Sequence, residues 1–212
     1  MEQIMEQIYR IGIIPVVVLK DAGNALALGR ALCESGLPCA EVTFRTDAAE
    51  ASISLLAQNE PKLLVGAGTV LTVEQADCAI KAGAKFIVSP GLNPKLVRHC
   101  QEKEIPVIPG ILTPSEIEQA LELGLEVVKF FPAEPAGGLP MIKAMGAAYT
   151  KLRFMPTGGI TIENVSEYLK CDKILACGGS WMVKEALVDA GRYEEIATLC
   201  RQAAGVVKAI RG

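Results

Sequence analysis

The sequence EVVKFFP, residues Glu126–Pro132, places one lysine in a short apolar run that begins after Gly124. Such a run predicts a buried strand, and the alternation of side chains along a strand puts Val127, Lys129 and Phe131 on one face. A lysine is rarely buried, because removing an ammonium group from water is costly. Either the amine is held neutral among apolar neighbours and attacks a carbonyl group, or it lies at the wet end of the strand with only its stem packed.

This segment is one of eight strand-like runs, each followed by a segment of helical character, at a spacing of roughly 20 to 30 residues. The predicted strands cover residues 13–19, 39–45, 63–69, 85–88, 106–108, 126–132, 153–156 and 173–176. Alternation of strands and helices is typical of a parallel sheet, and eight such units close a barrel. We therefore expect an α/β fold, a (β/α)8 TIM barrel with a short N-terminal helix over residues 2–9, in which residues 1–212 form a single domain. A doubly wound sheet, the competing architecture, predicts fewer strands.

The composition argues against several classes of partner. The chain has 212 residues, half of them apolar, and a net charge of −3, so we expect a large core and no basic surface for nucleic acid or an anionic membrane. No apolar run approaches the length of a membrane span, and residues 1–6 lack the basic and apolar regions of a signal peptide, so we expect neither a membrane-spanning segment nor a signal peptide. Its seven cysteines are scattered without a C-x-x-C pair, which favours a reducing compartment, and we expect a cytoplasmic protein.

Cofactor and metal chemistry have little support in the sequence. His99 is the single histidine, which argues against Ser-His-Asp and Cys-His schemes and against a histidine zinc cluster. An all-carboxylate magnesium site remains an alternative, with Glu41 and Glu134 as candidate ligands. The segment Gly66–Leu71 has a leucine where a dinucleotide fingerprint needs its third glycine, so we reject NAD binding. We predict neither a metal nor a cofactor.

The second predicted strand carries polar side chains at every second position. In EVTFR, Glu41, Thr43 and Arg45 share one face, while Val42 and Phe44 share the other. If the apolar face packs on the helices, the polar face points into the barrel. One interpretation is a structural ion pair across the barrel mouth. The functional interpretation makes Glu41 a proton shuttle and Arg45 a bidentate clamp for a carboxylate.

Glycine pairs follow the last two predicted strands. They are Gly158-Gly159 and Gly178-Gly179, the second followed by Ser180. In (β/α)8 barrels a phosphate group is often held by the loops after strands seven and eight, where backbone N–H groups and a helix N-terminus favour an anion. Ordinary tight turns would also use glycine. Two pairs at these two positions favour the phosphate site.

Six motifs carry a family resemblance that spans nearly the whole chain. They are EVTFRT (41–46), GAGTV (66–70), SPG (89–91), VKFFPAE (128–134), PTGG (156–159) and GGS (178–180). With them the chain resembles the class I aldolases for 2-keto-3-deoxy-6-phosphogluconate (KDPG) and 4-hydroxy-2-oxoglutarate (KHG). The resemblance implies a homotrimer of barrels that works without metal and whose lysine forms a Schiff base with the keto group.

The resemblance agrees with the chemistry inferred from the residues. Lys129 attacks C2 of a 2-keto acid, and the protonated imine serves as an electron sink. Glu41 handles the protons, including that of the C4 hydroxyl as the C3–C4 bond breaks. Cleavage of KDPG gives pyruvate and glyceraldehyde 3-phosphate.

The other positions of the motifs match binding residues. The resemblance implies that Arg45 and Thr69 hold the carboxylate and that Thr157 lies near the substrate hydroxyls. Pro90 and Phe131 wall the pocket. The predicted phosphate ligands are Gly158, Gly159, Gly179 and Ser180. Lys20, where the family has lysine or arginine, either touches the phosphate or caps the barrel mouth.

Several substrates fit the sequence. KHG, which would give pyruvate and glyoxylate, and 2-keto-3-deoxy-6-phosphogalactonate differ from KDPG by a phosphate group or one stereocentre. Two further classes are a phosphosugar epimerase or decarboxylase, which needs metal ligands or an aspartate pair at the strand ends, and a 2-keto acid binding protein, which has no use for Lys129.

Overall fold

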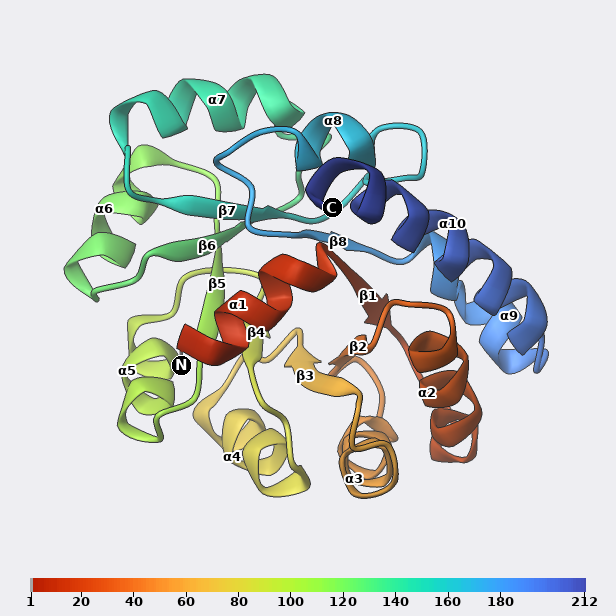
Figure 1. Cartoon of the computed structure of the whole chain (residues 1–212). Helices are drawn as coiled ribbons and strands as arrows, with labels where there is room; N and C mark the ends of the chain where they lie inside the picture. The colour runs from red at the N-terminus through yellow and green to blue at the C-terminus, as the bar shows by residue number, and fades with distance from the viewer. Residues whose placement is uncertain (1) are drawn as a thin grey trace.

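The computed structural model describes residues 2–212. Eight parallel strands follow one another around a barrel, in the order β7-β6-β5-β4-β3-β2-β1-β8, and helices surround them (Figure 1). Two isolated bridges, Phe154 with Ile174 and Thr157 with Gly178, join β7 to the segment that contains β8. The predicted (β/α)8 fold is confirmed. No helix within residues 2–212 combines the length and apolarity needed to cross a membrane.

The strands are β1 (Ile13–Val17), β2 (Cys39–Thr43), β3 (Leu64–Gly68), β4 (Ile87–Ser89), β5 (Val107–Ile111), β6 (Val127–Phe130), β7 (Arg153–Pro156) and β8 (Cys177–Gly179). The helices are α1 (Glu2–Ile11), α2 (Ala25–Glu34), α3 (Ala49–Asn59), α4 (Val73–Ala82), α5 (Pro94–Glu102), α6 (Pro114–Glu122), α7 (Gly138–Ala148), α8 (Val165–Leu169), α9 (Glu185–Asp189) and α10 (Tyr193–Arg211). Two 3₁₀ helices, η1 (Ala22–Asn24) and η2 (Trp181–Val183), complete the set.

Local capping explains where several helices begin. Thr72 accepts a hydrogen bond from the N–H of Gln75 at the start of α4. Thr113 and Glu116 form the reciprocal capping box of α6, with proline at the first position of that helix. Both caps follow from the sequence, because hydroxyl and carboxylate side chains satisfy backbone N–H groups that have no partner inside the helix.

The eighth strand differs from the prediction. We expected residues 173–176, but β8 begins at Cys177 and pairs through Cys177, Gly178 and Gly179 with Ile13, Ile14 and Pro15 of β1. Residues 173–176 reach β7 through a single bridge at Ile174. Glycine weakens an isolated strand, so the sequence favoured the apolar run before it. The alignment with β1 instead selects the glycine-containing segment.

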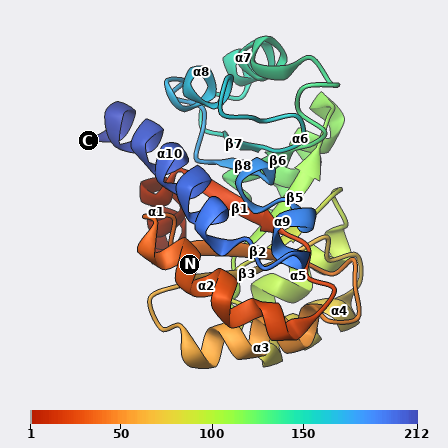
Figure 2. The same ribbon diagram turned by 90° about the vertical axis from the view of Figure 1, so that its right-hand side faces the viewer.

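The barrel has an inner and an outer apolar core. Alternation along each strand sends Ala40, Val42, Val128 and Phe130 toward the helices. The inner core consists of Ile8, Ile14, Cys39, Leu64, Phe86, Val88, Ile108, Val127, Met155, Leu175 and Ala176. Ile4, Met5 and Ile11 pack against it, so α1 covers one end of the barrel, as the two views show (Figures 1 and 2).

The C-terminal helix closes the same end. The guanidinium group of Arg211, near the end of α10, donates hydrogen bonds to the carbonyl oxygens of Tyr9, Leu175 and Ile174. It also lies 4.2 Å from the centroid of the Tyr9 ring. This Arg211 clasp connects α10 to α1 and to the residues that precede β8.

Candidate active site

Lys129 and Glu41 meet inside the barrel. They come from β6 and β2, which lie four strands apart in the order around the barrel. Lys129 is 5% exposed and Glu41 is fully buried, and the Nζ of Lys129 lies 3.4 Å from Oε1 of Glu41. The ring of Phe131 completes the surroundings, with its centroid 5.2 Å from Nζ. The structure therefore places the predicted lysine inside the barrel and not at a wet strand end.

Within residues 2–212, two buried oxygen atoms of the predicted site residues have no hydrogen-bond partner. They are Oε2 of Glu41 and Oγ1 of Thr157. A buried polar atom without a partner is destabilising, commonly by about 1–3 kcal/mol. A purely structural ion pair would be expected to satisfy these atoms, whereas a substrate hydroxyl or a water can do so in a working site.

Gly68 makes room for the carboxylate of Glu41. A Cβ atom at Gly68 would lie 2.3 Å from Oε1 of Glu41. The next residue, Thr69, has φ of +55°, which is an unfavourable backbone conformation for a β-branched residue. Such strain is common where a side chain has a functional position. Thr69 thus follows β3 directly at the barrel mouth, as expected for a residue that touches substrate.

Arg45 lies in the exposed turn that follows β2 at the barrel mouth, and not on the inward face of the strand as the sequence-based prediction had it. β2 ends at Thr43, so the alternation that orients Glu41 stops two residues earlier, and Arg45 is exposed in the following turn. Thr43 is buried and donates a hydrogen bond to the carbonyl of Val17. Arg45 instead helps to line a hollow of about 310 Å³ with Phe44, Thr46, Asp47, Glu50 and Gln75.

The glycine segments after β7 and within β8 lie side by side. Thr157 is bridged to Gly178, and a Cβ atom at Gly178 would lie 2.3 Å from Oγ1 of Thr157. Gly158 and Gly159 both have positive φ, at +98° and +82°. The backbone therefore turns sharply here, and exposed N–H groups in such turns suit an anion.

No long helix starts at Ser180, although a helix N-terminus often contributes to a phosphate site at this place in a barrel. Ser180 precedes the three-residue η2, and the five-residue α9 follows. Two such short segments have little dipole, so a helix N-terminus does not contribute to anion binding here as expected. The backbone N–H groups of the turn are the donors that remain.

The wall residues lie in the turns that follow β4 and β6. Pro90 and Phe131 are both half-buried. Ser89 donates a hydrogen bond of 2.8 Å to the carbonyl of Gly91, which holds the turn around Pro90.

Lys20 lies three residues beyond β1 and pairs with α9. Its Nζ is 3.1 Å from Oδ2 of Asp189 and also contacts Glu185, and hydrogen bonds to these carboxylates raise the pKa of Lys20. The side chain is 59% exposed. In this arrangement Lys20 connects the turn after β1 to the helix after β8, at the rim of the barrel.

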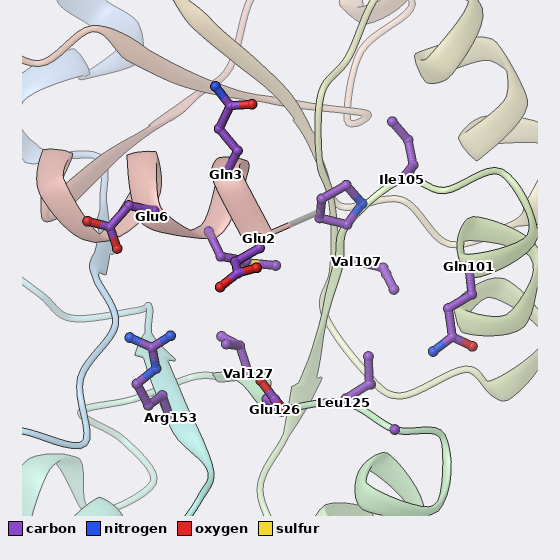
Figure 3. Close-up of a pocket in the computed structure, with 13 residues that line it drawn as sticks. Glu2, Gln3, Glu6, Gln101, Ile105, Val107, Leu125, Glu126, Val127 and Arg153 are labelled. Atoms are coloured by element: carbon purple, nitrogen blue, oxygen red, sulfur yellow. The ribbon is translucent and has the colours of Figure 1, made fainter.

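A larger groove, of about 950 Å³, lies at the end of the barrel that α1 covers. Apolar residues such as Met5 and Val127 line it, together with the charged Glu2, Glu6, Glu126 and Arg153 (Figure 3). It is formed by α1 and by the beginnings of β5, β6 and β7, whereas Lys129 and Glu41 lie farther along their strands. Active sites of (β/α)8 barrels lie at the opposite, C-terminal end of the strands. His99, which pairs with Asp77 at 2.7 Å, lies on α5 outside the barrel.

Sequence reasoning missed three contributors to the site. Gly68 was placed in a motif but not recognised as the space beside Glu41, and Gly178 was not recognised as the space beside Thr157. Glu134 was considered only as a metal ligand. The available signal for Gly68 was its position: Gly66 and Gly68 share the inward face of a strand next to the one that carries Glu41.

A buried lysine paired with a carboxylate inside a (β/α)8 barrel is the arrangement expected of a class I aldolase, a lyase that forms an imine with a keto substrate. The family model for KDPG and KHG aldolase matches residues 4–199 of the chain. The chain therefore belongs to the KDPG and KHG aldolase family, and it is a carbon–carbon lyase.

Relatives in several bacteria support this assignment along the full chain. The 2-dehydro-3-deoxy-phosphogluconate aldolase of Treponema pallidum is 49% identical over 204 residues, which are 96% of this chain and 97% of the relative. The protein of the same name from Haemophilus influenzae is 46% identical over 207 residues, 98% of each. A crystal structure of the Legionella pneumophila KDPG aldolase holds pyruvate captured at low pH as a covalent carbinolamine intermediate. It is 39% identical, with a TM-score of 0.90 over 93% of this chain and 96% of that one.

Proposed function

We propose that this aldolase reversibly cleaves KDPG to pyruvate and glyceraldehyde 3-phosphate through an imine on Lys129. The observation that carries the proposal is the 3.4 Å approach of Lys129 to Glu41 in the buried centre of the barrel. The carboxylate accepts a proton from the ammonium group, and the neutral amine then attacks C2 of the keto acid. Glu41 returns this proton to the carbinolamine hydroxyl, which leaves as water, so that the protonated imine forms and Glu41 is again a carboxylate.

Glu41 serves the next proton transfers in the same place. As a base it removes the proton of the C4 hydroxyl, the C3–C4 bond breaks, and its electrons move into the imine to form an enamine. The aldehyde product leaves. Protonation of the enamine at C3 by Glu41 regenerates an imine, and water hydrolyses it to pyruvate and the free lysine. Oε2 of Glu41, which has no partner within residues 2–212, is available for these transfers.

The remaining site residues bind the two ends of the substrate. Arg45 and Thr69 hold the carboxylate, and Thr157 accepts or donates a hydrogen bond at the substrate hydroxyls. Backbone N–H groups of Gly158, Gly159, Gly179 and Ser180 bind the phosphate. Lys20, which pairs with Asp189 and Glu185, caps the barrel mouth. Pro90 and Phe131 exclude water from the imine.

The glycine segments favour a phosphorylated substrate over KHG. Their position supports this preference, because two adjacent glycine turns at the ends of β7 and β8 provide donors that KHG, which has no phosphate, would leave unused. KHG is proposed as a slower substrate. A comparison of kcat/KM for KDPG, its galactonate epimer and KHG tests this order of preference. If either alternative has a higher kcat/KM than KDPG, that compound becomes the assigned substrate.

The first experiment is borohydride reduction with pyruvate, followed by peptide mass spectrometry. A reduced pyruvate adduct on the peptide that contains Lys129 is expected. Lys129→Ala should abolish both the adduct and KDPG cleavage. Undiminished cleavage by this variant would refute the imine assignment. Activity that is lost in a chelator would instead favour a metal-dependent epimerase or decarboxylase.

We further propose that residues 1–212 form a single catalytic domain, that the protein is a homotrimer and that it works in the cytoplasm. The continuous outer core supports a single domain. The family resemblance supports the homotrimer, and the seven free cysteines support the cytoplasm. A single unfolding transition, a light-scattering mass three times that of one chain, and cell fractionation test these statements.

A further inference from the structure

Glu134 lies in the turn after β6, where a buried tyrosine anchors its carboxylate. The hydroxyl of Tyr168, on α8, donates a hydrogen bond to Oε1 of Glu134. Tyr168 is 2% exposed and is among the largest fully buried side chains. Burial first, and then the bond to Glu134, raise the pKa of Tyr168 above its usual range. The tyrosine therefore remains a protonated donor over the whole range in which the enzyme could work.

Glu134 touches both glycines of the loop that follows β7. Its backbone N–H donates to the carbonyl of Gly158 at 3.0 Å. Gly159 packs on its side chain so closely that a Cβ atom at Gly159 would lie 2.5 Å from the Cβ of Glu134. The preceding residue, Ala133, donates to the carbonyl of Thr157 at 2.8 Å. The position of the Thr157–Gly159 loop therefore depends on where Glu134 is held.

A second contact holds the loop from the other side. The amide Nδ2 of Asn164 donates to the carbonyl of Gly159 at 3.0 Å, and its Oδ1 accepts from the N–H of Thr161 at 2.9 Å. The loop is thus suspended between Asn164 and Glu134. Of these two supports, Glu134 also carries a charge, and a carboxylate free to swing beside an anion site would repel a phosphate.

We propose that Glu134, anchored by Tyr168, is a positioning residue that sets the glycine loop for phosphate and thereby the preference for a phosphorylated 2-keto acid. The proposal rests on the proposed function, because it assigns a further residue to the same site. Neither side chain needs to touch the reacting carbon atoms. Loss of the anchor should therefore weaken phosphate recognition and leave the imine chemistry at Lys129 intact.

Tyr168→Phe is the sharpest test, because it removes one oxygen atom and retains the buried ring. We expect KM for KDPG to rise about tenfold with little change in kcat, as befits the loss of one charge-assisted hydrogen bond that supports a binding loop. With 2-keto-3-deoxygluconate, which lacks the phosphate, kcat/KM should change by less than about twofold. Inhibition by inorganic phosphate should weaken in parallel with KM for KDPG.

Tyr149→Phe is the matched control. The hydroxyl of Tyr149 also donates to a glutamate, Glu118, at 3.2 Å, but it connects the end of α7 to α6, away from the barrel mouth. This variant should leave both substrates unaffected. Glu134→Gln retains an oxygen that can accept from Tyr168 and should preserve most of the discrimination, whereas Glu134→Ala should lose it. Glu134 is exposed, so its variants should fold even if Tyr168→Phe does not, and they then provide the test.

An equal change for the phosphorylated and non-phosphorylated substrates, or no change for either, would overturn the proposal. Borohydride trapping of pyruvate separates this outcome from failure of the proposed function. Absence of an adduct on Lys129 in the unmodified enzyme would refute the proposed function. An adduct of normal yield in the variants, with unchanged discrimination, would refute only the role of Glu134 and Tyr168.

Discussion

The two ends of the barrel are built differently from the same strands. At the end covered by α1, which we call the base, inward-facing residues such as Leu64, Phe86 and Val127 form an apolar core. At the opposite end, the mouth, the inward-facing positions of β2 and β6 carry Glu41 and Lys129, and the buried oxygen atoms Oε2 of Glu41 and Oγ1 of Thr157 have no partner among residues 2–212. The base follows the packing rule for a stable interior. The mouth departs from it, which marks the site where chemistry outweighs stability.

The strand β3 has residues that contact the base and the mouth only two positions apart. Gly66 and Gly68 share the inward face of β3. A Cβ atom at Gly66 would lie 2.2 Å from the ring of Phe86, at the base, whereas one at Gly68 would collide with the carboxylate of Glu41. Substitutions two residues apart should therefore affect different properties, stability in one case and activity in the other.

The largest effect is expected from removing the amine at the mouth. Lys129→Met should lower kcat/KM for KDPG by about 10³-fold or more, because no other group can form the imine. Arg153→Met, which removes a cation from the rim of the groove at the base, is the matched control and should change kcat/KM by less than about twofold. Steady-state kinetics on both variants, with circular dichroism to verify folding, provide the measurement. A tenth of the original activity in Lys129→Met would contradict the assignment.

Gly68→Ala should come next. The added methyl group displaces the carboxylate of Glu41, and a displacement of about 1 Å in a catalytic group can lower the rate about 10²-fold. Gly205→Ala in α10 is the control, because its Cβ atom would meet nothing within 4 Å. That variant should retain full activity and gain about 0.5–1 kcal/mol in the free energy of unfolding. Equal kinetics for the two variants would argue against a dependence of the reaction on the position of Glu41.

Gly66→Ala should have the reverse profile. Overpacking against Phe86 should lower the free energy of unfolding by about 1–3 kcal/mol, while kcat per folded molecule remains nearly unchanged. Urea unfolding followed by fluorescence, together with kcat below the transition, measures both quantities. A large loss of kcat without a loss of stability would abolish the distinction between base and mouth.

The smallest effect is expected at the Arg211 clasp. Arg211→Met leaves the carbonyls of Tyr9, Leu175 and Ile174 without their donor, and the free energy of unfolding should fall by about 1–2 kcal/mol with no change in kcat. Arg10→Gln, which breaks an exposed pair with Glu6, should change it by less than about 0.5 kcal/mol. Thermal denaturation of the two variants compares them directly, and equal midpoints would show that the clasp is dispensable.

Much of the barrel and the identity of the central pair were predictable, because both depend on intrinsic periodicities. Alternation along a strand has a period of two in any context, so the inward directions of Glu41 and Lys129 followed from their own segments. The direction of Arg45 did not, because β2 ends at Thr43, and where a strand ends depends on its neighbours. The start of β8 depends likewise on its alignment with β1.

The residues that position the site could not be predicted from local sequence patterns. Tyr168 and Glu134 are 34 residues apart, and no spacing rule connects a turn after one strand to a short helix after the next. The role of Gly68 is steric and requires the coordinates of Glu41. Residues that react can thus be read from their chemistry, whereas residues that position them emerge only when the chain is folded.

The Arg211 clasp also has a consequence for the order in which the chain can fold during synthesis. Tyr9 leaves the ribosome 202 residues before Arg211, so the contact between them forms only after all eight strands have been made. Until then α1 lacks one of its attachments, so it covers the apolar base of the barrel less firmly against solvent. The nascent protein therefore exposes its stable end longest, and a chaperone that binds apolar surface would be expected to engage it there.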